Sequence, residues 1–184
     1  MVIKFKEMII ALLIIILISI LILNHKNLLK LVYPIYYEDI IVEEAKKNDL
    51  DPYLIISVIY VESKFRTKAT SPKGARGLMQ VMPKTGKWIS TVFGYKDFSP
   101  EDLYEPKINI SFGSWYLKEL IGRFDNLYTV LAAYNGGEGN VKRWLEEGVW
   151  DGSYENVEDI PFGETRDYVA RVIRTLLRYK YIYE

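Results

Sequence analysis

Apolar residues recur at helical spacing in seven successive segments of this chain, and no run alternates between apolar and polar residues as a half-buried strand would. Residues that start or stop helices, chiefly Pro, Gly, Asn and Asp, stand at most of the boundaries. We therefore expect a mainly helical fold with one core in the roughly 150 residues after the N-terminal segment. The predicted helices cover residues 38–48, 52–65, 83–91, 106–122, 126–134, 139–147 and 164–181. The last should bury Val169, Val172, Ile173, Leu176 and Leu177.

The N-terminal segment is strongly hydrophobic. Met8–Leu23 is apolar apart from one serine, and it follows Lys4 and Lys6. Its 16 residues fall between a signal-peptide core and a spanning helix of about 20 residues, but no small-residue cleavage site follows. We predict a transmembrane signal anchor in preference to a cleaved signal peptide, with the N-terminus in the cytoplasm and the globular part outside the membrane. The predicted organisation is an anchor over residues 1–26, a tether over 27–37 and a globular domain over 38–184.

The composition excludes several classes of function. Lys plus Arg equal Asp plus Glu at 24 each, so no basic field favours nucleic acid as a partner. The chain has no cysteine and a single histidine, His25, beside the hydrophobic segment. A thiol nucleophile is therefore impossible, and a histidine-based triad or zinc site is disfavoured. We expect neither a metal nor another cofactor.

Glu62 is the residue with the clearest chemical implication. Asp51-Pro52 predicts a helix start, with an N-cap oxygen followed by proline at the first helical position. Glu62 lies four residues after Val58 and three after Ile59, so its carboxyl leaves the helix on the buried side or at its edge. Desolvation raises a carboxyl pKa and allows proton donation near neutral pH. The position alone is equally compatible with an ordinary glutamate at a helix edge.

Three further segments hold polar groups where helices start or end. Gly77–Pro83 carries Gln80, whose amide can donate and accept hydrogen bonds to a sugar substituent at once. Ala132–Gly137 ends in Asn-Gly-Gly, which is also an ordinary helix stop. Ile160–Val169 contains Glu164, which is also favourable simply as an acid in the first turn of a helix.

Together these segments resemble the catalytic domain of the soluble lytic transglycosylases, the goose-lysozyme-like family 1 enzymes that cleave peptidoglycan. The resemblance covers roughly residues 38–181, and any one of its motifs alone would be weak. Five motifs occur in the family's order, namely Glu62-Ser63, Ser71–Pro83, Asn109–Leu117, Ala133–Asn135 and Glu164–Val169.

The resemblance implies a lysozyme-like helical fold and a catalytic role for one carboxyl group. Glu62 would protonate the oxygen between N-acetylmuramic acid and N-acetylglucosamine, and would then take a proton from the C6 hydroxyl, which closes a 1,6-anhydro ring without consuming water. Gly136 stands where many relatives have alanine, which removes no chemical group. The family's substrate-contacting and supporting positions correspond to Ser71, Gln80, Met82, Tyr134, Asn135, Glu164 and Tyr168.

The expected partner is the peptidoglycan glycan strand, bound by a monomeric, membrane-anchored enzyme. One alternative is a hydrolytic muramidase of similar fold, in which Asp97, Asp102 or Glu164 positions a water molecule. A second alternative is a non-catalytic glycan-binding protein tethered at the cell surface.

Overall fold

The computed structural model describes residues 4–184, and these residues form helices joined by loops. Their only β-type pairings are two isolated bridges, from Arg76 to Thr70 and to Val81. The helices are α1 (Phe5–Leu23), α2 (His25–Val32), α3 (Glu38–Asn48), α4 (Pro52–Ser63), α5 (Pro83–Val92), η1 (Pro100–Tyr104), α6 (Pro106–Ile121), α7 (Leu127–Gly136), α8 (Glu138–Glu146), η2 (Val157–Asp159) and α9 (Gly163–Tyr183).

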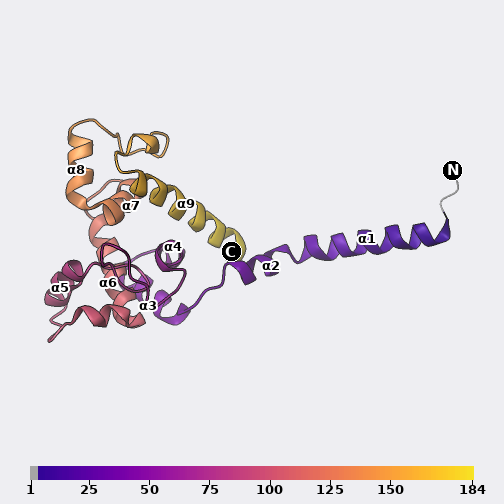
Figure 1. Cartoon of the computed structure of the whole chain (residues 1–184), viewed down its shortest axis with the longest axis horizontal. Coiled ribbons are helices and arrows are strands. Elements are labelled where there is room, and N and C mark those ends of the chain that lie inside the picture. The colour runs from indigo at the N-terminus through magenta and orange to yellow at the C-terminus, as the bar shows by residue number, and fades with distance from the viewer. Residues whose placement is uncertain (1–3) are drawn as a thin grey trace. The chain divides into compact units, whose positions relative to one another are not determined.

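The chain divides into two compact units (Figure 1). One contains the N-terminal residues up to Pro34 together with Tyr179–Glu184, and the other is Ile35–Arg178. Within the first unit, the end of α9 contacts the residues that follow α2. The hydroxyl of Tyr179 donates to the backbone oxygen of Pro34 at 3.2 Å, and that of Tyr183 donates to the backbone oxygen of Tyr33 at 2.9 Å. Helix α2 occupies much of the range expected as a tether.

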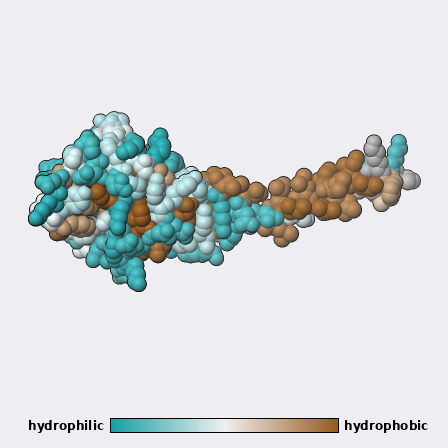
Figure 2. Space-filling view, turned by 90° about the horizontal axis from the view of Figure 1, so that it is seen from below, coloured by the Kyte–Doolittle hydropathy of each residue, from teal (hydrophilic) through white to brown (hydrophobic). Residues whose placement is uncertain are grey.

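Helix α1 exposes apolar side chains along its length, as the brown surface in Figure 2 shows. No single helix in the described part of the chain is both long and apolar enough to cross a membrane. Glu7–Leu23 and His25–Val32 meet the length and composition criteria only as a pair, and this pair is bent by 59°.

In the unit Ile35–Arg178, helix α4 is buried on nearly every side. All six residues from Leu54 to Ile59 are buried, and α3 packs on both α4 and α6. Helix α6 contributes Phe112, Leu117 and Leu120 to the same core and contacts α7, which packs on α8. A helix this deeply buried is a rigid support for any group at its end.

The seven predicted helices of this unit are confirmed to within about three residues. Helix α4 ends at Ser63, two residues before the predicted end, because Lys64 and Phe65 adopt left-handed backbone angles, with φ of 52° and 60°. The prediction that Leu177 is buried was wrong, since its side chain is 63% exposed whereas Val169 and Val172 are fully buried. Tyr179, seven residues after Val172, is also buried, whereas Leu177 lies on a different face of the helix.

Candidate active site

Glu62 lies in the last turn of α4, and the start of that helix is well fixed. The Asp51 carboxylate accepts a hydrogen bond from the backbone N–H of Tyr53 at 2.8 Å, and Pro52 occupies the first turn. Val58 and Ile59, one turn before Glu62, are completely buried. Glu62 itself is half-buried, so the side chain reaches solvent while protein atoms surround its base.

The surroundings of Glu62 favour its protonated form. Burial raises the pKa of this carboxyl from an ordinary 4.5 to about 7, and the negative charge of Glu164 adds to the rise. The Tyr168 hydroxyl and the Arg171 guanidinium oppose it by favouring the carboxylate. Burial outweighs these opposing influences, so Glu62 can hold a proton near neutral pH and can also release it.

Two tyrosines stand beside Glu62, the half-buried Tyr134 and the fully buried Tyr168. Burial, together with the nearby charge of Glu62, raises the pKa of both Tyr134 and Tyr168 well above 10, so both phenols stay protonated. The Tyr134 hydroxyl donates to the backbone oxygen of Met79 at 2.8 Å. The Tyr168 hydroxyl is buried without a hydrogen bond of ordinary geometry, although it is close enough to Glu62 to lower that carboxyl's pKa. The Tyr168 O–H is therefore available as a hydrogen-bond donor beside the carboxyl.

The Gly77–Gln80 turn is held by one buried side chain. The Asn109 amide accepts from the N–H of Met79 at 2.7 Å and donates to the carbonyls of Arg76 and Leu103 at 2.8 and 2.6 Å. Gly77 has φ of +78°, and a Cβ there would lie 2.3 Å from the Asn109 amide nitrogen. No side chain fits between the turn and Asn109, which explains the glycine.

Gln80 is in a left-handed conformation, with φ of 49°. Its amide nitrogen donates to the carbonyls of Gly77 and Ala69 at 2.8 and 3.2 Å. These bonds fix the side chain, and Gln80 lines the cavities described below. Non-glycine residues in this conformation are uncommon and concentrate at functional sites.

Tyr134 and Asn135 occupy the last turn of α7, which Gly137 terminates with φ of 90°. The Asn135 side-chain oxygen accepts from the Thr165 hydroxyl at 2.8 Å, so the start of α9 orients the amide. Gly136 packs against Thr165 as well, because a Cβ at Gly136 would lie 2.9 Å from its hydroxyl oxygen. The end of α7 and the start of α9 thus form one wall of the site.

Three adjoining cavities form a groove, which we call the Glu62 groove. They have volumes of about 470, 120 and 350 Å³, and neighbouring cavities share wall residues, with Gln80 in all three. Glu62 lines the first two, so it lies within the groove and not at its end. The first cavity has a basic wall with Arg66 and Lys68, and the third is lined by Tyr116 and Tyr134. The middle cavity is lined by Glu62, Ser71, Lys73, Ala75, Gln80, Met82, Tyr134, Asn135 and Glu164.

The structure thus brings seven of the eight predicted site residues to one cavity. The exception is Tyr168, which lies beneath it with its side chain buried. Sequence reasoning missed Lys73, whose ammonium pairs with Glu164 at 2.7 Å across the groove, and Arg171. Arg171 follows Tyr168 by three residues, so helical spacing could have placed it on the same face. Nothing in the sequence indicated Lys73.

Two of the acids considered as alternatives lie elsewhere. Asp102 accepts from the backbone N–H of Ser99 at 2.8 Å and caps η1, while Asp97 is exposed in the preceding loop. Neither lines the Glu62 groove, whereas Glu164 does. Only Glu164 is therefore placed to assist Glu62 as a second carboxylate.

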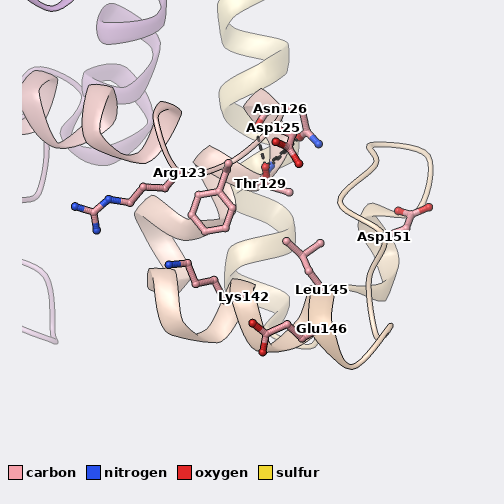
Figure 3. A pocket seen from close by; sticks show the side chains of 9 residues that line it. Arg123, Asp125, Asn126, Thr129, Lys142, Leu145, Glu146 and Asp151 are labelled. Carbon is pink, nitrogen blue, oxygen red and sulfur yellow. Dashed lines mark hydrogen bonds between the residues drawn. The ribbon is translucent and has the colours of Figure 1, made fainter.

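A second pocket lies beside α8 and the loop before α7, and it shares no residue with the Glu62 groove (Figure 3). Its cations are already paired, because Arg123 and Lys142 both contact Glu138 at 2.7 Å. Its Asn126 caps α7. Across residues 4–184, no three His, Cys, Asp or Glu side chains gather closely enough to hold a metal ion.

Comparison with known proteins identifies the family. Residues 39–156 match the family described as "Transglycosylase SLT domain". The chain belongs to this family. It is 37% identical to the soluble lytic murein transglycosylase of Salmonella typhimurium over 145 residues, which cover 77% of this chain and 22% of the relative. This membership agrees with the resemblance found in the motifs.

A solved structure gives the same result for the fold. The lytic transglycosylase Slt of Pseudomonas aeruginosa, solved as an inactive glutamate-to-glutamine mutant, superposes with a TM-score of 0.74 at 36% identity, covering 83% of this chain and 25% of that one. The expected mainly helical, lysozyme-like fold is confirmed. This chain spans about a quarter of the length of these two relatives.

A shorter relative is described as membrane-bound. The membrane-bound lytic murein transglycosylase C of Actinobacillus pleuropneumoniae is 27% identical over 171 residues, which cover 79% of this chain and 46% of the relative. Membrane association therefore occurs among the proteins that this chain resembles.

Proposed function

We propose that this chain is a peptidoglycan lytic transglycosylase that cleaves the β-1,4 bond between N-acetylmuramic acid and N-acetylglucosamine and leaves 1,6-anhydromuramyl ends. The observation that carries the proposal is Glu62, a half-buried carboxyl with a pKa of about 7 within a groove that extends on both sides of it. Family membership and the names of the relatives support the same activity.

In the first step, protonated Glu62 donates its proton to the glycosidic oxygen as the bond from that oxygen to the anomeric carbon breaks. The leaving sugar departs with a free hydroxyl, and positive charge develops at the anomeric carbon. The substrate's 2-acetamido oxygen stabilises that charge. A carboxyl with a pKa near 7 suits this step, because a large fraction is protonated at neutral pH.

In the second step, Glu62 acts as the base. Its carboxylate takes the proton from the C6 hydroxyl of the same muramic acid, whose oxygen bonds to the anomeric carbon and closes the 1,6-anhydro ring. The proton gained equals the proton lost, so Glu62 returns to its starting state and no water is consumed. Holding the hydroxyl on the reacting sugar gives it a high effective concentration.

The other groove residues would position the sugars. Gln80, held by two hydrogen bonds, and Asn135, held by Thr165, offer amide groups for hydroxyl and acetamido substituents. Ser71 and Met82 would contact the rings near the cleaved bond, and Tyr134 would form the opposite wall. Glu164 and Tyr168 would tune Glu62, the first by its charge and the second by its hydroxyl.

We assign residues 38–184 to this catalytic domain, residues 27–37 to a tether and residues 1–26 to a single-pass anchor that keeps the domain outside the membrane. The apolar surface of α1 and the membrane-bound relative support the anchor. Flotation of the full chain with lipid vesicles, compared with a variant carrying Leu13→Glu and Ile16→Glu, tests it. Equal flotation of the two proteins would contradict the anchor.

The activity is tested by digesting purified cell-wall sacculi with the full chain in mild detergent. The masses of the soluble products are then determined by mass spectrometry. We expect anhydromuramyl ends, which are lighter by one water than hydrolytic ends, and none from Glu62→Gln. Glu147→Gln, which changes an exposed glutamate outside the groove, is the matched control and should remain active. Reducing ends from the wild-type chain would instead establish the muramidase, with Glu164 as its second carboxylate. Equal products from wild type and Glu62→Gln would show that Glu62 is not the catalytic acid and base.

A further inference from the structure

Aromatic side chains continue beyond the groove wall at Tyr116. The ring of Tyr134 lies 5.5 Å from that of Tyr116, and Tyr116 lies 6.3 Å from Trp88 of α5. Trp88 also contacts Trp115 at 5.2 Å. Tyr134 and Tyr116 line the third cavity of the Glu62 groove, and Trp88 does not. Trp88 is therefore the next aromatic group along the wall, just past the cavity.

Helix α5 places Trp88 on the face of the helix that lines the third cavity. Met82, at the start of α5, and Thr85 both line the third cavity, and Trp88 follows Thr85 by three residues, so the two share one face of the helix. Helix α6 packs beside α5 in Figure 1. Its residues Trp115 and Tyr116 contact the indole of Trp88. The indole is thus held between two rigid helices and not on a mobile loop.

Trp88 is 42% exposed, although neighbouring rings give it a fixed place. Its surroundings are not uniformly apolar, because the Arg123 guanidinium lies 6.0 Å from the indole ring and pairs with Glu138 at 2.7 Å. The guanidinium lies over the ring, and covering this ion pair with lipid or an apolar protein surface would be costly. A sugar suits it better, because a pyranose offers a C–H face to the ring and hydroxyls to the ion pair.

We infer that Trp88 is a remote sugar-binding platform that holds a part of the same glycan strand beyond the sugars adjacent to Glu62. This inference rests on the proposed function, because it takes the groove to bind a glycan. The rings of Tyr134, Tyr116 and Trp88 follow one another at 5.5 and 6.3 Å, but they are inclined to each other by 44° and 88°, so Trp88 would bind its sugar as a separate contact. A strand that extends from Glu62 past Tyr134 and Tyr116 reaches Trp88, whereas a short fragment does not.

The inference predicts a dependence on ligand length. In a Glu62→Gln background, N-acetylglucosamine oligomers of increasing length are titrated into the full chain in detergent, and binding is followed by calorimetry. With Trp88 present, affinity should keep rising with length after the central cavity is filled. Trp88→Ala should lower the affinity for long oligomers about threefold to tenfold and leave short ones unchanged. An identical length dependence in the two proteins would overturn the inference.

Three comparisons make the result specific. Trp88→Phe keeps a ring and should recover most of the affinity for long oligomers, while Trp88→Leu, which keeps apolar bulk without a ring, replaces the alanine variant if that variant does not fold. Tyr154→Ala removes a half-buried ring whose centre lies 5.2 Å from that of Tyr128, outside the groove, and should leave the length dependence unchanged. If Trp88→Ala alters vesicle binding or oligomeric state without changing the length dependence, the platform is refuted in favour of a membrane or a second copy.

Failure of the inference is distinguishable from failure of the proposed function. Sacculus digestion by wild type reports the reaction, whereas oligomer titration reports the platform. Anhydro products with no effect of Trp88→Ala on length dependence would leave the function standing and remove the platform. Hydrolytic products together with the predicted length dependence would refute the transglycosylase function and leave the platform standing.

Discussion

Replacing Glu62 by glutamine should stabilise the folded protein at alkaline pH and leave its stability almost unchanged in acid. Glutamine resembles the protonated carboxyl, which is the form that the site prefers. The rise of the Glu62 pKa from 4.5 to about 7 corresponds to roughly 3 kcal/mol, since a tenfold change in an ionisation constant is worth about 1.4 kcal/mol. The wild-type protein carries this cost only when Glu62 is ionised.

The direction follows from proton linkage. Because the folded pKa lies above the unfolded one, the folded state holds the Glu62 proton more tightly, and its contribution to stability is fully present below about pH 4.5. That contribution is lost as the pH rises towards and through about 7, after which the penalty is constant. Wild type and Glu62→Gln should therefore diverge across this window, with the variant more stable by roughly 3 kcal/mol above it.

The measurement is urea denaturation of both full-length proteins in the same detergent at about pH 4 and about pH 8.5. Comparing the difference between the proteins at the two pH values cancels any pH-independent effect of the substitution. Glu147→Gln, an exposed change, should show almost no divergence. If the free energies of unfolding of Glu62→Gln and wild type differ by the same amount at both pH values, burial does not raise the pKa of Glu62.

Three further substitutions test the support of the site. Asn109→Ala removes three hydrogen bonds and leaves buried backbone groups unpaired, so urea denaturation should show a loss of roughly 3 kcal/mol or more; a loss below about 1 kcal/mol would contradict the assigned bonds. Tyr168→Phe removes the hydroxyl that lowers the Glu62 pKa, so the alkaline limb of the pH–activity profile should move to higher pH, and an unmoved limb would exclude the influence of Tyr168. Lys73→Gln breaks an ion pair whose side chains are 76% and 63% exposed, so stability should fall by less than about 1 kcal/mol in thermal denaturation, and a larger loss would show a structural role.

Helix positions could be predicted because each is encoded locally. Asp51-Pro52 marks the start of α4 through a side-chain cap and a preset backbone angle, and both features are present in the structure. The end of α4 was misplaced because Lys64 and Phe65 are in left-handed conformations that nothing in their side chains favours. Phe65 is buried and its ring packs 5.5 Å from that of Tyr36, a contact between distant residues that a local pattern cannot reveal.

The site residues could be named from motifs, but their physical relations could not. Lys73 and Glu164 lie 91 residues apart in the chain and form an ion pair across the groove. The clamp of Asn109 on the Gly77–Gln80 turn joins residues about 30 positions apart. Such pairings depend on how the helices pack, and a single sequence carries no record of which distant residues meet.

A lone carboxyl that serves as acid and then as base needs a pKa between the values suited to each role. Burial alone would raise the pKa of Glu62 further, so the protonated acid would be favoured and too little carboxylate would form to act as the base. The Tyr168 hydroxyl and the Arg171 guanidinium act in the opposite direction, towards the carboxylate. Both are on α9, while Glu62 is on α4, so the positions of these two side chains relative to Glu62 set the balance. Substitutions that displace Tyr168 or Arg171 from Glu62 should therefore alter the pH dependence of the activity before they unfold the protein.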